Sequence, residues 1–159
     1  MSGVHKINFK KLAICLGISL GVGLLSGIIS MMGMESFKQA NTPPLTPPDF
    51  IFPIVWTILF ILMGISSYII STSDSPDKTT ALAVYGLQLG VNFFWPLLFF
   101  NLSAYLFSFI WIILLWILII VMIKLFWNIS KPAALLQIPY LLWVTFAAYL
   151  NFGVYLLNS

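Results

Sequence analysis

The residues from Leu12 to Met32 form a run of 21 amino acids without a single charge. As an α-helix that rises about 1.5 Å per residue, such a run crosses the roughly 30 Å hydrocarbon core of a bilayer. It is longer than the apolar part of a cleaved signal peptide, and no small-residue cleavage site ends it. The run therefore predicts a retained membrane-spanning helix.

Four further apolar runs follow, and most of the turns between them are short and polar. The five expected helices cover about residues 12–32, 50–71, 81–101, 104–127 and 133–157. Only 7% of the 159 residues are charged and 61% are hydrophobic, whereas about a quarter of the residues of a soluble domain are charged. We therefore expect an all-α integral membrane protein: a bundle of five transmembrane helices in the lipid bilayer, forming a single domain over residues 1–159.

The lysines indicate how this bundle is oriented. With alternating helix directions, the end that bears the N-terminus collects six lysines, and the other end has Lys38 alone. The six are Lys6, Lys10, Lys11, Lys78, Lys124 and Lys131. Because positive residues concentrate on the cytoplasmic side of a membrane, this asymmetry predicts a cytoplasmic N-terminus and an external C-terminus.

Residues 33–49 are expected to form the only long loop. Four of them are prolines, in the segment Pro43-Pro44-Leu45-Thr46-Pro47-Pro48. Proline fixes the backbone angle φ and lacks an N–H donor, so this loop should be stiff and non-helical. Asp49 is expected to be the N-cap of the helix that follows.

Several classes of function are disfavoured. The single cysteine, Cys15, and the single histidine, His5, leave no set of side chains that converges on a metal, and we expect no metal and no cofactor. No carboxylate or histidine pair lies inside a span, which argues against acid–base catalysis and proton-coupled transport. The basic residues are lysines at helix ends without arginine, so a nucleic-acid partner is not expected.

The third expected helix has two distinct faces. Gln88, Asn92, Trp95 and Phe99 share one face at 100° per residue, and the glycines at 86 and 90 share the opposite one. Amides are costly against lipid, so both should point into the bundle. Two interpretations remain open: the amides bond to neighbouring helices, or they line a cavity. The two glycines suit close contact with another helix.

Aromatic residues form similar stripes on two other helices. The second expected helix carries Trp56 and Phe60 on one side, and the fifth carries Tyr140, Trp143, Ala147 and Leu150. One such stripe is more typical of core packing. Three helices that each turn a tryptophan inward favour a cavity for a flat apolar ligand, since flat rings stack on aromatic walls.

The first helix carries Gly17, Gly21, Gly23 and Gly27. Small residues four apart let helix backbones approach closely in lipid. Close packing within the bundle is the favoured interpretation here, ahead of a dedicated dimer face.

Three motifs together resemble the signatures of the translocator protein family. These proteins are also called tryptophan-rich sensory proteins, and they are related to the peripheral benzodiazepine receptor. The motifs are Pro43-x-x-Thr46-Pro47-Pro48 with Phe52-Pro53-Ile54-Val55-Trp56, Gln88-x-x-x-Asn92-x-x-Trp95-Pro96-x-x-Phe99, and Pro139-Tyr140-x-x-Trp143-x-x-x-Ala147-x-x-Leu150-Asn151. They occur in the family's order along essentially the whole chain.

The resemblance implies a five-helix bundle whose first loop covers a pocket for porphyrins, such as protoporphyrin IX, and for benzodiazepine-type ligands. Trp56, Asn92, Trp95, Trp143, Ala147 and Leu150 match pocket positions of the family. It further implies a homodimer in a bacterial cell membrane. The family's cholesterol-recognition segment ends in a basic residue, but none follows Tyr149–Tyr155 here, and Phe107 replaces a further pocket tryptophan of some relatives.

Three functions are compatible with this resemblance. The first is a tetrapyrrole-binding receptor or sensor whose ligand contacts come from the stripes described above: Trp56, Phe60, Gln88, Asn92, Trp95, Phe99, Tyr140, Trp143, Ala147 and Leu150. The second is light- and oxygen-dependent degradation of porphyrin, in which the resemblance gives Trp56 and Trp143 the reactive roles. The third is passive transport of porphyrins or lipids.

Overall fold

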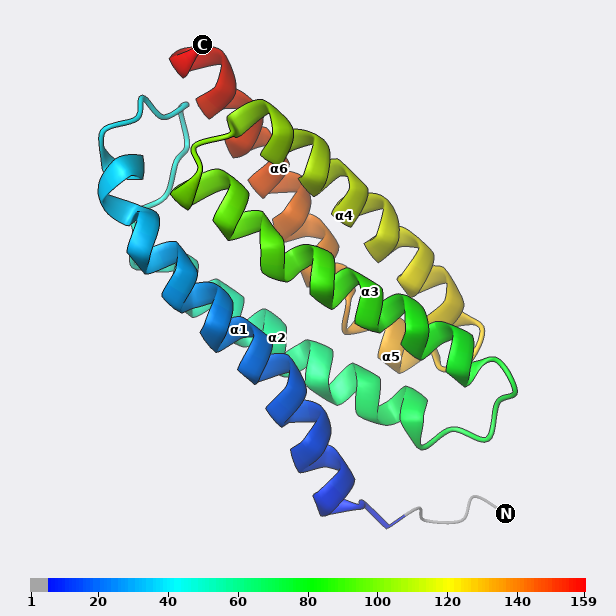
Figure 1. Ribbon diagram of the computed structural model, residues 1–159. Coiled ribbons are helices and arrows are strands. Elements are labelled where there is room, and N and C mark those ends of the chain that lie inside the picture. The colour runs from blue at the N-terminus through cyan, green and yellow to red at the C-terminus, as the bar shows by residue number, and fades with distance from the viewer. Residues whose placement is uncertain (1–5) are drawn as a thin grey trace.

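The computed structural model describes residues 6–159, and every helix in that range belongs to one bundle (Figure 1). The elements are α1 (Phe9–Lys38), α2 (Ile51–Ser71), α3 (Lys78–Pro96), the π-helical turn η1 (Leu97–Asn101), α4 (Tyr105–Trp127), α5 (Lys131–Leu135) and α6 (Ile138–Asn158). Helix α3 continues into η1, and α5 continues into α6. The described residues therefore contain five helical segments that are long and apolar enough to cross a membrane. The expected all-α bundle of five spans is confirmed.

Helix α1 is longer than the sequence predicted. Its 30 residues correspond to about 45 Å at 1.5 Å per residue, well beyond the roughly 30 Å of hydrocarbon. The helix begins after Asn8, whose side chain accepts a hydrogen bond from the Lys11 N–H. It continues to Lys38, so the prediction of a loop from residue 33 was wrong for residues 33–38. No proline interrupts that stretch, and Gly33 lies close against the backbone of Phe100.

Two prolines interrupt the predicted third and fifth helices. Pro96 has no N–H for an α-helical bond, and after it the chain switches to η1, in which the Leu102 N–H bonds to the Leu97 carbonyl at 3.0 Å, five residues back. Pro139 stands in the first turn of α6, where its missing donor costs little, and a short break separates α6 from α5.

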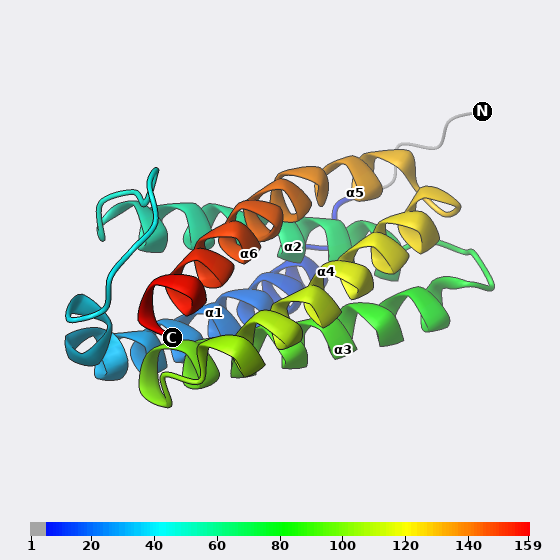
Figure 2. The ribbon, with the colours of Figure 1, turned by 90° about the horizontal axis from the view of Figure 1, so that it is seen from above.

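The loop between α1 and α2, residues 39–50, is fastened to the C-terminal half of α6 (Figure 2). The Tyr149 hydroxyl donates to the Pro44 carbonyl at 2.9 Å, and the Asn158 amide exchanges bonds of 3.0 and 2.8 Å with the Asn41 backbone. Asp49 is not the N-cap of α2: Phe50 holds that position, and no side chain caps it.

The half of the bundle nearer the lysine-rich end is solidly packed. Fully buried side chains from α2 to α5 fill it: Met63, Ile70, Ala81, Ile119, Met122, Phe126, Ala133 and Ala134. Buried hydroxyls there bond across helices, Ser19 to the Phe60 carbonyl at 2.8 Å and Ser66 to the Ala133 carbonyl at 2.7 Å.

The glycines contribute unequally to this packing. Only Gly23 among the four glycines of α1 considered above lies close to another helix, with the Phe60 ring 2.5 Å from where a Cβ would stand. Positions 17, 21 and 27 have no such neighbour. Gly86 and Gly90 on α3 are also exposed, and a Cβ at either would meet nothing within 4 Å in the described chain. The expected close contact on their face is therefore not made inside this bundle.

Candidate functional site: an aromatic cavity under the loop

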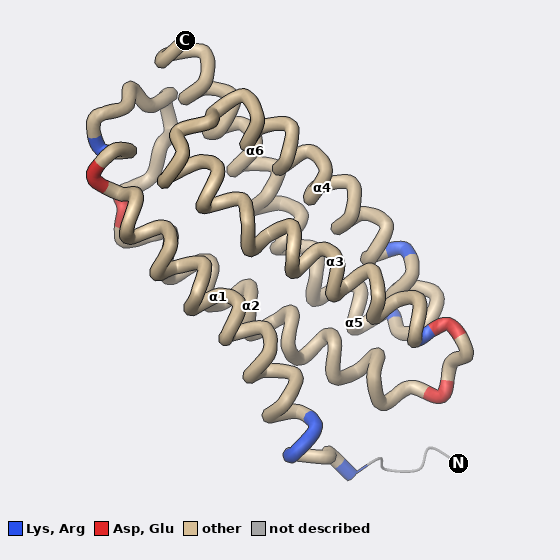
Figure 3. The backbone as a smooth tube through the Cα atoms, in the orientation of Figure 1, with Lys and Arg blue, Asp and Glu red and all other residues tan. Residues whose placement is uncertain are grey.

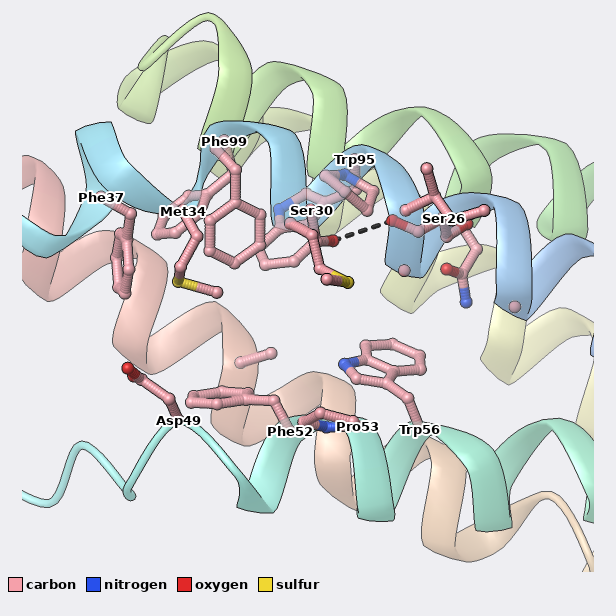
Figure 4. Close-up of a pocket in the computed structure, with 18 of the residues that line it drawn as sticks. Ser26, Ser30, Met34, Phe37, Asp49, Phe52, Pro53, Trp56, Trp95 and Phe99 are labelled. Carbon is pink, nitrogen blue, oxygen red and sulfur yellow. Dashed lines mark hydrogen bonds between the residues drawn. The ribbon is translucent and has the colours of Figure 1, made fainter.

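A cavity of about 570 Å³ occupies the other half of the bundle, under the α1–α2 loop. Its walls come from α1, α2, α3 with η1, and α6, while α4 contributes none of its lining. Figure 4 shows side chains from α1 and α2 pointing toward one another across this space.

Three tryptophans from three helices form the aromatic walls. Trp95 is held by a 3.0 Å hydrogen bond from its indole N–H to the Asn151 side chain, and it stacks on Phe99 with ring centres 5.0 Å apart. Trp143 meets Phe52 edge to face at 5.9 Å. Trp56 projects from α2 with its indole nitrogen turned toward the cavity interior (Figure 4).

The floor of the cavity is Asn92, which is tied to a buried tyrosine. The Asn92 amide donates to the Tyr140 hydroxyl at 2.7 Å, and that hydroxyl donates to the Gln88 amide oxygen at 2.6 Å. All three side chains are at least 97% buried. Both amides therefore hydrogen-bond to a neighbouring helix, which is the first of the two interpretations given above. Asn92 also lines the cavity, which is the second.

Eight of the ten residues predicted to bind ligand line this one cavity. They are Trp56, Phe60, Asn92, Trp95, Phe99, Trp143, Ala147 and Leu150. The other two, Gln88 and Tyr140, lie one layer deeper and support Asn92 from behind. Phe107 is 53% exposed on α4 and lies away from the cavity.

The wall of the cavity that α1 provides was not predicted from the sequence. Ser26, Ser30, Met34 and Phe37 line the cavity along one face of α1, at intervals of three and four residues that place them together. Phe37 also contacts Phe99 at 5.3 Å between ring centres. Met34 and Phe37 were missed because residues 33–49 were expected to form a loop. Ser26 and Ser30 lay inside the predicted first helix, but only its glycines were considered there, mainly for packing within the bundle.

The cavity also has a mouth. Leu24, Ile28 and Met31 of α1 line it and are 47–75% exposed, as befits an opening between α1 and α2. Thr46 and Asp49 line the loop end. Asp49 is the one ionisable residue in the lining.

The chemistry available in this lining is stacking, apolar contact and a few hydrogen bonds. Within residues 6–159, no three His, Cys, Asp or Glu side chains come together as metal ligands would. His5 lies outside the described residues, and Cys15 is a half-buried free thiol on α1.

The fold and this cavity define a multi-pass membrane protein with an aromatic chamber between its helices. Comparison with known sequences specifies the class: the profile of the TspO/MBR family matches residues 14–157. The chain belongs to the TspO/MBR family.

Curated relatives extend over most of the chain. It is 37% identical over 150 residues to the tryptophan-rich protein TspO of Chlorobaculum tepidum, covering 92% of this chain and 95% of that protein. It is 35% identical over 154 residues to the protein of the same name from Archaeoglobus fulgidus, covering 96% of this chain and all of that protein. The translocator protein of Ovis aries is 32% identical over 126 residues, with 77% and 75% covered.

Proposed function

We propose that this chain is a membrane receptor for flat apolar ligands, with porphyrins such as protoporphyrin IX as the main class and benzodiazepine-type molecules as the second. The observation that carries the proposal is the convergence of Trp56, Trp95 and Trp143 from three helices on one cavity. Its volume of about 570 Å³ falls in the usual range for small-molecule sites. Aromatic walls favour ring systems that can stack on them.

Tryptophan fluorescence tests this proposal. Protoporphyrin IX added to the purified protein in the dark should quench the indoles of the cavity. Ala147→Phe places a ring in the chamber, because Ala147 is 6% exposed and lines it, and should weaken binding about tenfold. Leu142→Phe, at a 65% exposed position on the same helix outside this cavity, is the control and should bind normally. Equal affinities for the two variants would refute the site.

A second candidate function is degradation of the bound porphyrin under light and oxygen. Trp56 and Trp143 support it, because both indoles line the cavity and would lie beside a bound ring. The porphyrin and oxygen would supply the chemistry, and the protein would supply orientation and an oxidisable side chain. Pigment absorbance under illumination should then fall with wild-type protein and persist with a Trp56→Phe, Trp143→Phe double variant that still binds. Equal pigment loss in both proteins would exclude these residues as its agents.

We further propose that the protein forms a homodimer through α3. Gly86 and Gly90 place two side-chain-free positions four residues apart on the exposed side of that helix, and a Cβ at either position would meet nothing within 4 Å among residues 6–159. A second copy could approach closely there. Gly90→Leu should shift the protein from dimer to monomer in light scattering, and an unchanged mass would contradict this interface.

The bundle is proposed to lie in a bacterial cell membrane with its N-terminus in the cytoplasm. Figure 3 shows most of the blue lysine positions at the end of the bundle that bears the N-terminus, and one blue position near red acidic positions at the other end. By sequence, Lys38 is the lysine of that other end. The positive end of a membrane protein faces the cytoplasm.

A further inference from the structure

Asp49 is the one lining residue of the cavity that carries a charge, and it stands at the loop end. Figure 4 shows its carboxylate directed across the loop end of the cavity toward Phe37, with the ring of Phe52 beside it. All three residues line the cavity. A carboxylate close to aromatic rings suits an organic cation, because ring faces and carboxylate both attract positive charge.

Asp49 is not the N-cap of α2, which is the role that the sequence predicted for it. Phe50 is the N-cap of α2, and no side-chain hydrogen bond closes that end of the helix. Asp49 is exposed and lies at the rim of a chamber whose other lining residues are uncharged. An acid beside a helix start also favours the helix modestly, but that effect is the same whatever ligand is bound.

We infer that Asp49 makes the cavity charge-selective: it favours flat apolar ligands that carry a protonated amine and disfavours those that carry carboxylates at the loop end. This inference rests on the proposed function, because it refines the ligand class of the same cavity. Two unit charges about 4 Å apart in water change an affinity about fivefold. Protoporphyrin IX is still held by stacking on the aromatic walls, but its free carboxylates weaken that binding about fivefold, and cationic side arms on the same ring strengthen it.

Three ligands built on one ring test the inference. They are protoporphyrin IX, its neutral dimethyl ester, and its amide with two aminoethyl arms. Dissociation constants are measured by tryptophan quenching in the dark at pH 7 for the wild type and Asp49→Asn. The variant should bind the dicarboxylate about fivefold more tightly and the diamine about fivefold less tightly, with the diester unchanged.

Asp74→Asn is the matched control. It removes the same charge from the turn between α2 and α3, at the opposite end of the bundle from the loop (Figure 3). All three ligands should bind this variant as they bind the wild type. Asp49→Glu, which keeps the carboxylate, should retain the wild-type order of affinities.

The outcomes separate this inference from the proposed function. An Asp49→Asn shift of the same size and sign for all three ligands would assign Asp49 to the shape of the loop and overturn charge selection. So would three unchanged affinities while the diester still binds. No quenching of the wild type by any of the three would refute porphyrin binding itself, and with it both proposals.

Discussion

Tyr140 joins the cavity floor to the packed half of the bundle through two hydrogen bonds. Its hydroxyl accepts from Asn92 at 2.7 Å and donates to Gln88 at 2.6 Å, and all three side chains are buried. Tyr140→Phe removes that hydroxyl and leaves an amide hydrogen and an amide oxygen without partners. We expect the free energy of unfolding to fall by about 1 to 2 kcal/mol.

Unfolding in mixed micelles with increasing dodecyl sulfate measures this change. Tyr149→Phe is the control, since it also deletes a tyrosine hydroxyl from α6, but one that makes a single bond, to the exposed loop. Its effect should be smaller than that of Tyr140→Phe. A Tyr140→Phe protein as stable as the wild type would show that the buried amides find other partners.

At the residue scale, helical spacing was sufficient to place Asn92 and Trp95 on an inward face, because position on a helix fixes direction. Spacing could not tell that Gln88 lies behind Asn92 while Asn92 lines the cavity. That difference depends on where Tyr140 arrives from a helix far along the chain. The position of Asp49 at the loop end of the cavity was also out of reach, since it depends on how residues 39–50 are fastened to α6.

Some glycines of α1, such as Gly33, lie against a neighbouring element, and others, such as Gly17, do not, so these two form a matched pair for a test. A Cβ on Gly33 would stand 2.5 Å from the carbonyl carbon of Phe100 and 2.8 Å from the Asn101 nitrogen. Both are backbone atoms of η1, so the two elements would have to separate. A Cβ on Gly17 would meet nothing within 4 Å in the part of the chain that the structure describes.

Gly33→Ala should therefore lower the thermal unfolding midpoint in detergent and weaken porphyrin binding, because α1 and η1 both wall the cavity. Gly17→Ala carries the same gain in helix propensity, about 1 kcal/mol in an isolated helix, without the collision. It should unfold at the wild-type temperature or slightly above it. Equal midpoints for the two variants would mean that η1 moves aside at no cost.

At the element scale, the apolar runs predicted the five spans well because length and lack of charge are local properties. The end of α1 was misjudged since Glu35 and Lys38 look like loop residues, although a helix that projects beyond the hydrocarbon can carry charges. The breaks at Pro96 and Pro139 have local causes, but whether a proline bends a helix or divides it depends on its neighbours.

For the molecule as a whole, the distribution of lysines makes the strongest prediction, because it concerns all five spans at once. Single cysteines in a Cys15→Ser background would report each end: Asn41→Cys in the α1–α2 loop and Pro76→Cys in the α2–α3 turn, both at exposed positions. With six lysines at the Pro76 end and one at the Asn41 end, the first end should remain in the cytoplasm. A membrane-impermeant maleimide should then label the Asn41→Cys protein in intact cells, and the Pro76→Cys protein only after permeabilisation.

The reverse labelling pattern would mean that the bundle is inverted, with the loop end of the cavity on the cytoplasmic side. Equal labelling of both proteins would mean that the chain inserts in two orientations. Either result would contradict the proposed topology, because the lysine asymmetry would then not decide the orientation.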